Sequence, residues 1–351
     1  MSLRRPLLAA PLALVLGLAA VAQAADEVVL IPNATLKIPG GRVRGTIKSE
    51  SPTEVVIQPT TGAPMTIPVD QIEAITYEGE PATMALARTR AENSPAEAAD
   101  LFKKAATEAA GKPYIVQAAL FGQAEAIAQL ALAAPNRLNE AIALLETFHK
   151  TYPVARQKAQ VLELLARLSL LKDDPNAADR YLAELEKIAW AKDRAVILRA
   201  DVLAARGQYE EAISRLDKII ADSKDNADQA RRAKLAKAKA LAGQKKFEDA
   251  EKTVREVIQD APPEAAEIQA VAYNTLGDCL RAAGRPKDAL FAYLKTDLLF
   301  DKDKEQHARA MAEIIQLWRL LKRDDRADEY QERLRQLYPQ SPFSSARPAP
   351  R

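Results

Sequence analysis

The residues that most often carry chemistry are scarce in this chain of 351 residues. Its two histidines, His149 and His307, are far apart, and its single cysteine, Cys279, excludes an internal disulfide. The sequence contains no HExxH, CxxC or glycine-rich phosphate-loop motif, and no GxSxG motif of a nucleophilic serine. We therefore predict no catalytic residue, no metal site and no cofactor, and a protein that is not an enzyme.

Carboxylates are the one potentially catalytic group that is plentiful. A pair of Asp or Glu side chains can act as general acid and base, so their number alone leaves a paired site open. Several of them stand where helices are expected to begin, and a negative charge there stabilises the helix dipole: Glu210, Glu211, Glu248 and Asp249. This placement favours a structural role for them.

The first 24 residues have the pattern of an export signal. The start MSLRR is basic, an apolar run follows, and Ala22–Ala24 form the small-x-small pattern that signal peptidase cleaves. We expect cleavage after Ala24 and a periplasmic or envelope-associated protein. The alternative is a retained membrane anchor, but Pro11 and Gly17 interrupt the apolar run, which is shorter than the roughly 20 residues that a spanning helix needs.

The charge balance of the remaining chain excludes classes of partner. The formal net charge is +2, and the signal contains two of the basic residues, Arg4 and Arg5, so the mature chain has 48 basic and 48 acidic residues. A balanced chain has no overall attraction to nucleic acid or anionic lipid. We therefore expect no nucleic-acid partner, and no membrane span after cleavage. The oligomeric state is left open.

Residues 25–80 alternate with the period of two that is typical of strands. Short β-branched runs such as RVRGTIKS and TEVVIQ are separated by turn signals at Pro39, Ser49 and Thr60. Five short strands predict a small antiparallel barrel-like domain, and the region resembles SH3-like and Sm-like barrels. Such a small core is expected to depend on its neighbour for stability.

Residues 81–340 follow helical periodicity and contain an internal repeat. Each repeat has a buried-type alanine followed four residues later by a large side chain, and the alanines are 34 to 43 residues apart: Ala98, Ala141, Ala178, Ala212, Ala250, Ala289 and Ala327. The last alanine has Gln331 where an apolar residue belongs, which suggests a terminal repeat that faces solvent. Periods of this length predict a solenoid of about seven helical hairpins. The fold class is therefore α+β, mostly α.

The best repeat resembles the tetratricopeptide repeat. Tyr273, Leu276, Gly277 and Leu280 fall on the W-x2-L-G-x2-Y spacing of that family, and Ala289 and Tyr293 fall on its A-x3-F spacing. Pro153, Pro262 and Pro339 match its closing proline, whereas Trp190 replaces that proline after Ala178. The whole layout is similar to tetratricopeptide-repeat proteins of the exported bacterial type.

The resemblance implies that the first helix of each hairpin lines a concave groove that binds a protein or peptide. Glu163 and Gln316 fall on these groove positions, as do ten candidate partner-binding residues: Arg167, Arg194, Asp201, Arg232, Lys239, Asn274, Asp278, Arg281, Arg309 and Arg319. The set is mainly basic, and arginine binds carboxylates with two parallel hydrogen bonds. An acidic partner is one expectation, and ordinary solvated charges are the other.

The sequence favours two functions over a third, an enzyme whose site would lie in the β domain. The first is an exported scaffold or adaptor that binds protein partners through the concave face. The second is a structural or secretion-complex subunit of the envelope, whose β domain binds polysaccharide or pairs an edge strand with a partner subunit. We also expect the solenoid to fold without residues 26–80, because repeats contact only their neighbours. Residues 341–351, rich in proline and serine, are expected to form a disordered tail.

Overall fold

The computed structural model describes residues 25–133, 135–223, 226–339 and 341–345. The expected signal peptide, its cleavage site and residues 346–351 of the tail lie outside these residues. A five-stranded sheet comes first: β1 (Asp26–Leu30), β2 (Arg42–Glu50), β3 (Glu54–Pro59), β4 (Met65–Pro68) and β5 (Ile72–Thr76).

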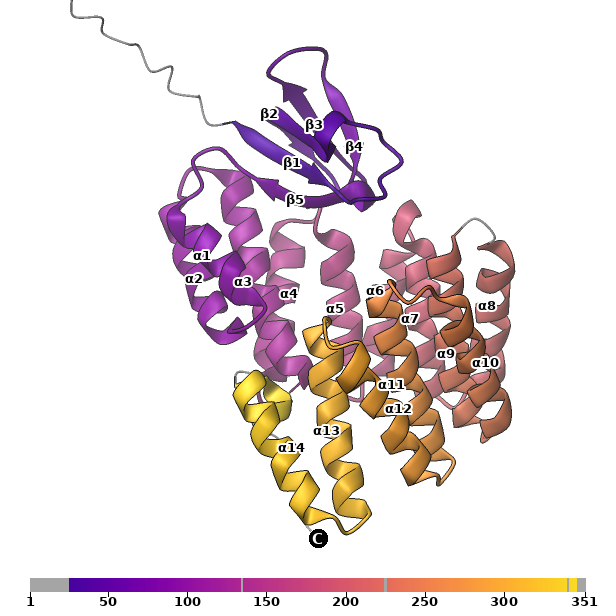
Figure 1. The fold of residues 1–351 in the computed structure, drawn as a ribbon. Helices are drawn as coiled ribbons and strands as arrows, with labels where there is room; N and C mark the ends of the chain where they lie inside the picture. The colour runs from indigo at the N-terminus through magenta and orange to yellow at the C-terminus, as the bar shows by residue number, and fades with distance from the viewer. Residues whose placement is uncertain (1–24, 134, 224–225, 340, 346–351) are drawn as a thin grey trace, which may run out of the picture.

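Helices fill the rest of the described chain and pair into seven antiparallel hairpins (Figure 1). The first four hairpins comprise α1 (Ala82–Ala91), α2 (Pro95–Glu108), α3 (Pro113–Ala133), α4 (Leu138–Thr151), α5 (Lys158–Leu171), α6 (Pro175–Leu185), α7 (Lys192–Ala205) and α8 (Tyr209–Asp222). The last three comprise α9 (Ala227–Gly243), α10 (Phe247–Asp260), α11 (Ala266–Ala282), α12 (Pro286–Leu299), α13 (Lys304–Leu320) and α14 (Asp324–Leu337). The solenoid of about seven hairpins is confirmed.

The sheet is antiparallel with the order β4-β3-β2-β1-β5. Along β2 the odd positions Val43, Gly45 and Ile47 are buried and the even ones are exposed, as the alternation predicted. Gly45 is required because a Cβ there would overlap the carbonyl of Gln58 on β3. The barrel-like expectation is wrong in one respect: β4 and β5 are the two edges, joined by the short helix η2 (Val69–Gln71), and the sheet is open.

The repeated alanines lie where the two helices of a hairpin cross. All seven, from Ala98 to Ala327, are fully or almost fully buried, and the large residues four positions on, such as Leu182, Leu216 and Val254, are buried beside them. In the best repeat Gly277 takes the equivalent place on the first helix, and a Cβ there would overlap the ring of Tyr293. Small residues therefore permit the close approach of the helices.

The second hairpin contains a helix that the periodicity did not single out. Residues Pro113–Leu132 of α3 have a mean hydropathy of 1.3, long and apolar enough to cross a membrane, and 61% of them are buried inside the protein. Gly122 of this helix lies against the ring of Phe102 on α2, where a Cβ would overlap it. In the structure α3 thus packs as the first helix of the second hairpin.

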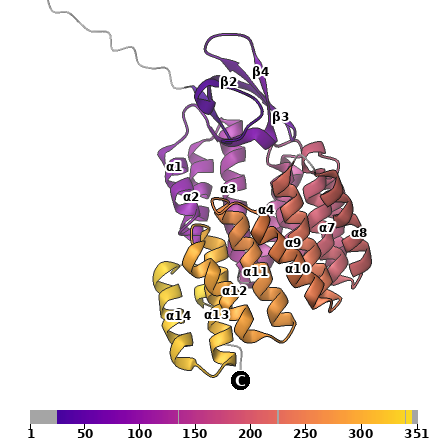
Figure 2. The ribbon, with the colours of Figure 1, turned by 45° about the vertical axis from the view of Figure 1, so that its right-hand side comes forward.

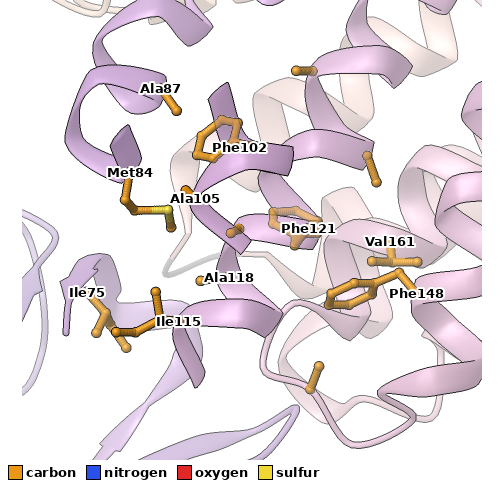
Figure 3. Close-up of a cluster of buried hydrophobic side chains, with 14 of the residues drawn as sticks. Ile75, Met84, Ala87, Phe102, Ala105, Ile115, Ala118, Phe121, Phe148 and Val161 are labelled. Atoms are coloured by element: carbon orange, nitrogen blue, oxygen red, sulfur yellow. The ribbon is translucent and has the colours of Figure 1, made fainter. Parts of the chain in front are cut away.

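The sheet and the first hairpins share one hydrophobic core (Figure 3). Ile75 of β5 lies beside Met84 of α1 and Ile115 of α3, and the same cluster continues to Phe148 of α4 and Val161 of α5. This continuity argues against the expectation that the solenoid folds without residues 26–80. The physical reason is that the sheet covers apolar side chains of α1 and α3 that would otherwise face water.

Residues 341–345 of the tail expected to be disordered are described, and they include a short helix. Pro342–Ser345 form the short helix η5, which lies beside α13 and α14. Gln331 is buried, and its side-chain amide donates to the carbonyl of Ser344 at 3.4 Å. The suggestion that Gln331 faces solvent is therefore wrong, because η5 covers the last repeat.

The two ends of the solenoid meet. Both views show α13 and α14 curving back beneath the first hairpins (Figures 1 and 2). The amine of Lys304, at the start of α13, lies 3.2 Å from the Glu92 carboxylate and 2.9 Å from the side-chain oxygen of Asn93, both just after α1. η5 also approaches α3. The hairpins thus make one closed turn of a superhelix.

Candidate functional site on the concave face

The first helices of the hairpins form the inside of the curve. Successive first helices such as α7, α9 and α11 contact one another, whereas successive second helices have far fewer close approaches. Packing is tighter on the inner side of a curved stack, so the first helices line its concave face. This places the predicted groove residues on α5, α7, α9, α11 and α13.

Polar bridges tie neighbouring first helices together. Arg194 of α7 donates to Glu163 of α5 at 2.8 Å, and Arg232 of α9 donates to Glu267 of α11 at 2.6 Å. Asn274 of α11 is buried and donates to the Gln306 carbonyl at 3.0 Å. Several predicted groove residues therefore already form hydrogen bonds or ion pairs with other residues of the protein.

Further bridges connect α11 with α12 and α13. Asp278 accepts from the Tyr293 hydroxyl and from the Arg309 guanidinium, each at 2.6 Å, and Arg281 pairs with Glu313 at 2.7 Å. Burial raises the pKa of Tyr293, and the adjacent Asp278 carboxylate raises it further, so its hydroxyl remains a donor. The structure thus brings Asp278, Arg281 and Arg309 into one cluster.

Four predicted residues do not join that network. Arg319 lies 4.0 Å from Asp328 of α14, within its own hairpin. Arg167, Asp201 and Lys239 are exposed and make no ion pair with any residue that the structure describes. Of the charges expected to meet a partner, these three form no ion pair with a described residue, although the charge of Arg167 favours the ionised form of Glu163 on the same helix.

A second polar cluster, which sequence reasoning missed, joins the sheet to the solenoid. The Tyr77 hydroxyl donates to Glu50 at 2.5 Å, Gln117 of α3 donates to the same carboxylate at 3.2 Å, and Arg156 lies 3.6 Å from it. Burial raises the pKa of Glu50 and outweighs the opposing effect of Arg156. No motif marks these residues, because they come from segments far apart in the chain.

The β2–β3 turn makes a further contact with the fourth hairpin. Trp190 lies just before α7 and donates from its ring nitrogen to the Pro52 carbonyl at 2.9 Å. Its appearance in place of the closing proline is the one sequence signal that could have indicated this contact. The sheet therefore spans from the first hairpin to the fourth.

The two edge strands of the sheet are the places where a partner subunit could add a strand. Arg88 of α1 donates to the Ile75 carbonyl of edge strand β5 at 3.2 Å and forms an ion pair with Glu80. The other edge, β4, spans only four residues and ends at Pro68. A short strand bounded by proline and a strand held by a helix are poor templates for strand addition.

The residues first examined for chemistry have structural roles. His307 lies between the Asp297 carboxylate at 2.7 Å and the Tyr338 hydroxyl at 2.5 Å, in a buried network between α12, α13 and α14. His149 lies 3.1 Å from Glu184. Burial raises the pKa of Cys279 to about 12, which keeps the thiol protonated. Among the described residues, no three His, Cys, Asp or Glu side chains are grouped to hold a metal.

The fold and the concave face define a helical-repeat protein of the kind that uses such a face for binding. Residues 203–272, from the end of α7 into α11, match the family model of the tetratricopeptide repeat. This central part of the solenoid therefore matches the tetratricopeptide repeat, and the β module lies N-terminal to the solenoid. A comparison with curated protein sequences finds no match.

Solved structures of similar fold have low sequence identity to this chain. A tetratricopeptide repeat protein from Parabacteroides merdae is 14% identical, with 72% of this chain and 91% of that chain covered and a TM-score of 0.47. PilW, described as a type IV pilus biogenesis factor, is 19% identical, with coverage of 63% and 96% and a TM-score of 0.39. PilF of Pseudomonas aeruginosa is 21% identical, with coverage of 63% and 94% and a TM-score of 0.33.

Proposed function

We propose that this protein is an exported, non-enzymatic scaffold that binds protein partners through the concave face of its solenoid. The observation that carries the proposal is a set of three exposed charges on the first helices that form no ion pair with a described residue: Arg167, Asp201 and Lys239. They lie beside hydrogen-bonded bridges that connect those helices. A rigid surface loses little conformational entropy when it binds, so its contacts contribute more fully to affinity.

The two free cations support an acidic contact within the partner. Exposed ion pairs contribute only about 0–1 kcal/mol each, so Arg167 and Lys239 would act together with other contacts. Four other arginines of the predicted groove already pair with carboxylates of the protein: Arg194, Arg232, Arg281 and Arg309. Fewer cations are therefore available to bind an acidic partner than the sequence implied.

Affinity capture from envelope extract tests the binding surface. The mature chain, from Ala25, is used as bait beside the double variant Arg167→Ala/Lys239→Ala. The matched control Lys218→Ala/Lys252→Ala removes the same charge from the second helices α8 and α10. We expect the partner band to weaken for the concave variant, and equal recovery with all three baits would reject the concave face.

Export is tested separately from binding. N-terminal sequencing of protein recovered outside the cytoplasm should give Ala25 as the first residue. An intact N-terminus on membrane-bound material would instead support the retained anchor.

The runner-up function assigns binding to the β module, through polysaccharide or a partner subunit. The apolar loop between β1 and β2 is what favours it: Leu30, Ile31, Leu36 and Ile38 line a shallow cavity of about 420 Å³. In the capture experiment, recovery that is lost after Leu36→Ser but unchanged in the concave variant would favour this second function.

A further inference from the structure

The three free charges of the concave face occupy equivalent positions in successive repeats. Arg167, Asp201 and Lys239 each directly follow the small residue at the hairpin crossing, which is Ala166, Ala200 or Ala238. Equivalent positions of stacked repeats form a continuous row across a solenoid. The row therefore carries a positive, a negative and a positive charge on α5, α7 and α9.

The row has a defined extent. Its next position is Asp278 on α11, which already accepts from Arg309 and from the Tyr293 hydroxyl. The following position is Gln316 on α13, which has no charge. Two other charged residues of the same helices are engaged, since Arg194 pairs with Glu163 and Arg232 pairs with Glu267. Arg167 interacts with Glu163 through its charge but forms no ion pair with it. The fold thus leaves three consecutive charges of alternating sign available to a ligand.

The spacing of the row suits an extended polypeptide. Packed helices have axes about 8–10 Å apart, and an extended chain advances about 3.3 Å per residue. One step along the row therefore corresponds to about three residues of an extended partner that crosses the first helices.

We propose that the row recognises an extended segment whose charges alternate negative, positive, negative at intervals of three residues. The proposal rests on the proposed function and specifies its partner: the segment needs a central cation opposite Asp201 as well as acidic residues opposite Arg167 and Lys239. An ordered pattern selects between partners, because a segment with the wrong order places like charges opposite each other.

Two synthetic peptides of identical composition test the order of charges. ESSKSSE carries the complementary order and KSSESSE does not, and both have blocked termini and equal net charge. Chemical-shift titration of the isotope-labelled mature chain measures each Kd at low salt, where exposed charges are least screened. We expect ESSKSSE to bind about fivefold tighter, with shifts on α5, α7 and α9.

A charge reversal in the protein supplies the matched test. In Asp201→Lys the row becomes wholly positive, so the two peptides should bind with equal affinity. Asp222→Lys makes the same change of net charge at the end of α8, and there the fivefold preference should remain.

The outcomes separate this inference from the proposed function. Equal affinity of both peptides for the unmodified chain, no binding of either, or a preference that survives Asp201→Lys overturns the ordered row. A peptide selected from a random 12-residue display library supplies the second arm. The selected peptide could bind the unmodified chain and lose affinity for Arg167→Ala/Lys239→Ala, while charge order has no effect. That result would support binding on the concave face and reject recognition of an ordered charge pattern. If no selected peptide is sensitive to that variant, the proposed function fails as well.

Discussion

At the residue scale, the close approach of two helices depends on the absence of a side chain at Gly277. A Cβ at this position would overlap the Tyr293 ring. The Tyr293 hydroxyl donates to Asp278, which also accepts from Arg309. A single backbone position therefore supports both the hairpin crossing and the polar cluster between α11 and α13.

We predict that Gly277→Leu destabilises the protein by about 1–3 kcal/mol, because the added side chain forces Tyr293 and the helices apart. Urea unfolding followed by circular dichroism measures the change. Glu256→Leu, which introduces leucine at an exposed position of α10, should stay within about 0.5 kcal/mol of the unmodified chain. Equal stability of the two variants would show that the crossing tolerates a side chain.

Glu125 of α3 gives a prediction about pH. Burial raises its pKa to about 6, against a partial opposing effect of Arg156. The folded state then binds more protons than the unfolded state between pH 4.5 and 6, so this group lowers the stability as the pH rises through that range.

Glu125→Gln removes this titration. We expect the variant to be more stable than the unmodified chain by about 1–2 kcal/mol at pH 7, and the difference to disappear near pH 4. Denaturation at several pH values gives the difference directly. A constant difference across the pH range would mean that Glu125 has an ordinary pKa in the folded protein.

At the element scale, the sheet acts as the N-terminal cap of the solenoid. It shares the hydrophobic core of α1 and α3, and its polar contacts reach Arg156 and Trp190. A chain that begins at Pro81 should therefore lose its cooperative melt or aggregate, because it exposes this core. Circular dichroism measures the helical content and the melt of this chain, and light scattering measures its aggregation. A soluble chain with full helical signal and a cooperative melt would show that the solenoid folds without the sheet.

The short helix η5 caps the opposite end. Ser344 donates from its hydroxyl to the Tyr338 carbonyl, and Phe343 packs on the last hairpin. A chain that ends at Pro339 should show faster amide hydrogen exchange in α14, because Gln331 and Tyr338 lose their cover. A chain that ends at Ser345 is the control and should exchange as the full chain does. Unchanged exchange after both truncations would mean that η5 does not stabilise α14.

The sequence predicts the elements well because their signals are local. The alternation in β2 and the spacing of alanines such as Ala212 follow from the periods of strand and helix, and the structure confirms both. The open sheet and the packed tail are set by long-range contacts, as between Gln331 and η5, which no local pattern encodes.

The candidate site is predictable in part for the same reason. The repeat frame assigned Arg167, Asp201 and Lys239 to the first helices, but a spacing argument does not reveal which charges pair. Arg194 finds Glu163 and Arg309 finds Asp278 through the stacking of neighbouring repeats. The Glu50 cluster combines four separate segments, so its residues become recognisable only in the folded chain.

At the scale of the whole molecule, contacts between distant segments connect the hairpins of the solenoid. The sheet spans the first four hairpins, Lys304 connects the last hairpin to the first, and η5 connects it to α3 of the second. These contacts connect the two ends of the concave face, whereas the second helices lie on the outside of the curve. A partner bound on the inside should therefore protect the first helices and leave the second helices unchanged.

Amide hydrogen exchange of a chain that begins at Ala25, with and without the partner recovered by capture, tests this claim most directly. We predict that bound partner slows exchange in α5, α7 and α9, with α6, α8 and α10 unaffected. Protection confined to the second helices, or to residues 26–76 of the sheet, would contradict the assignment of binding to the concave face.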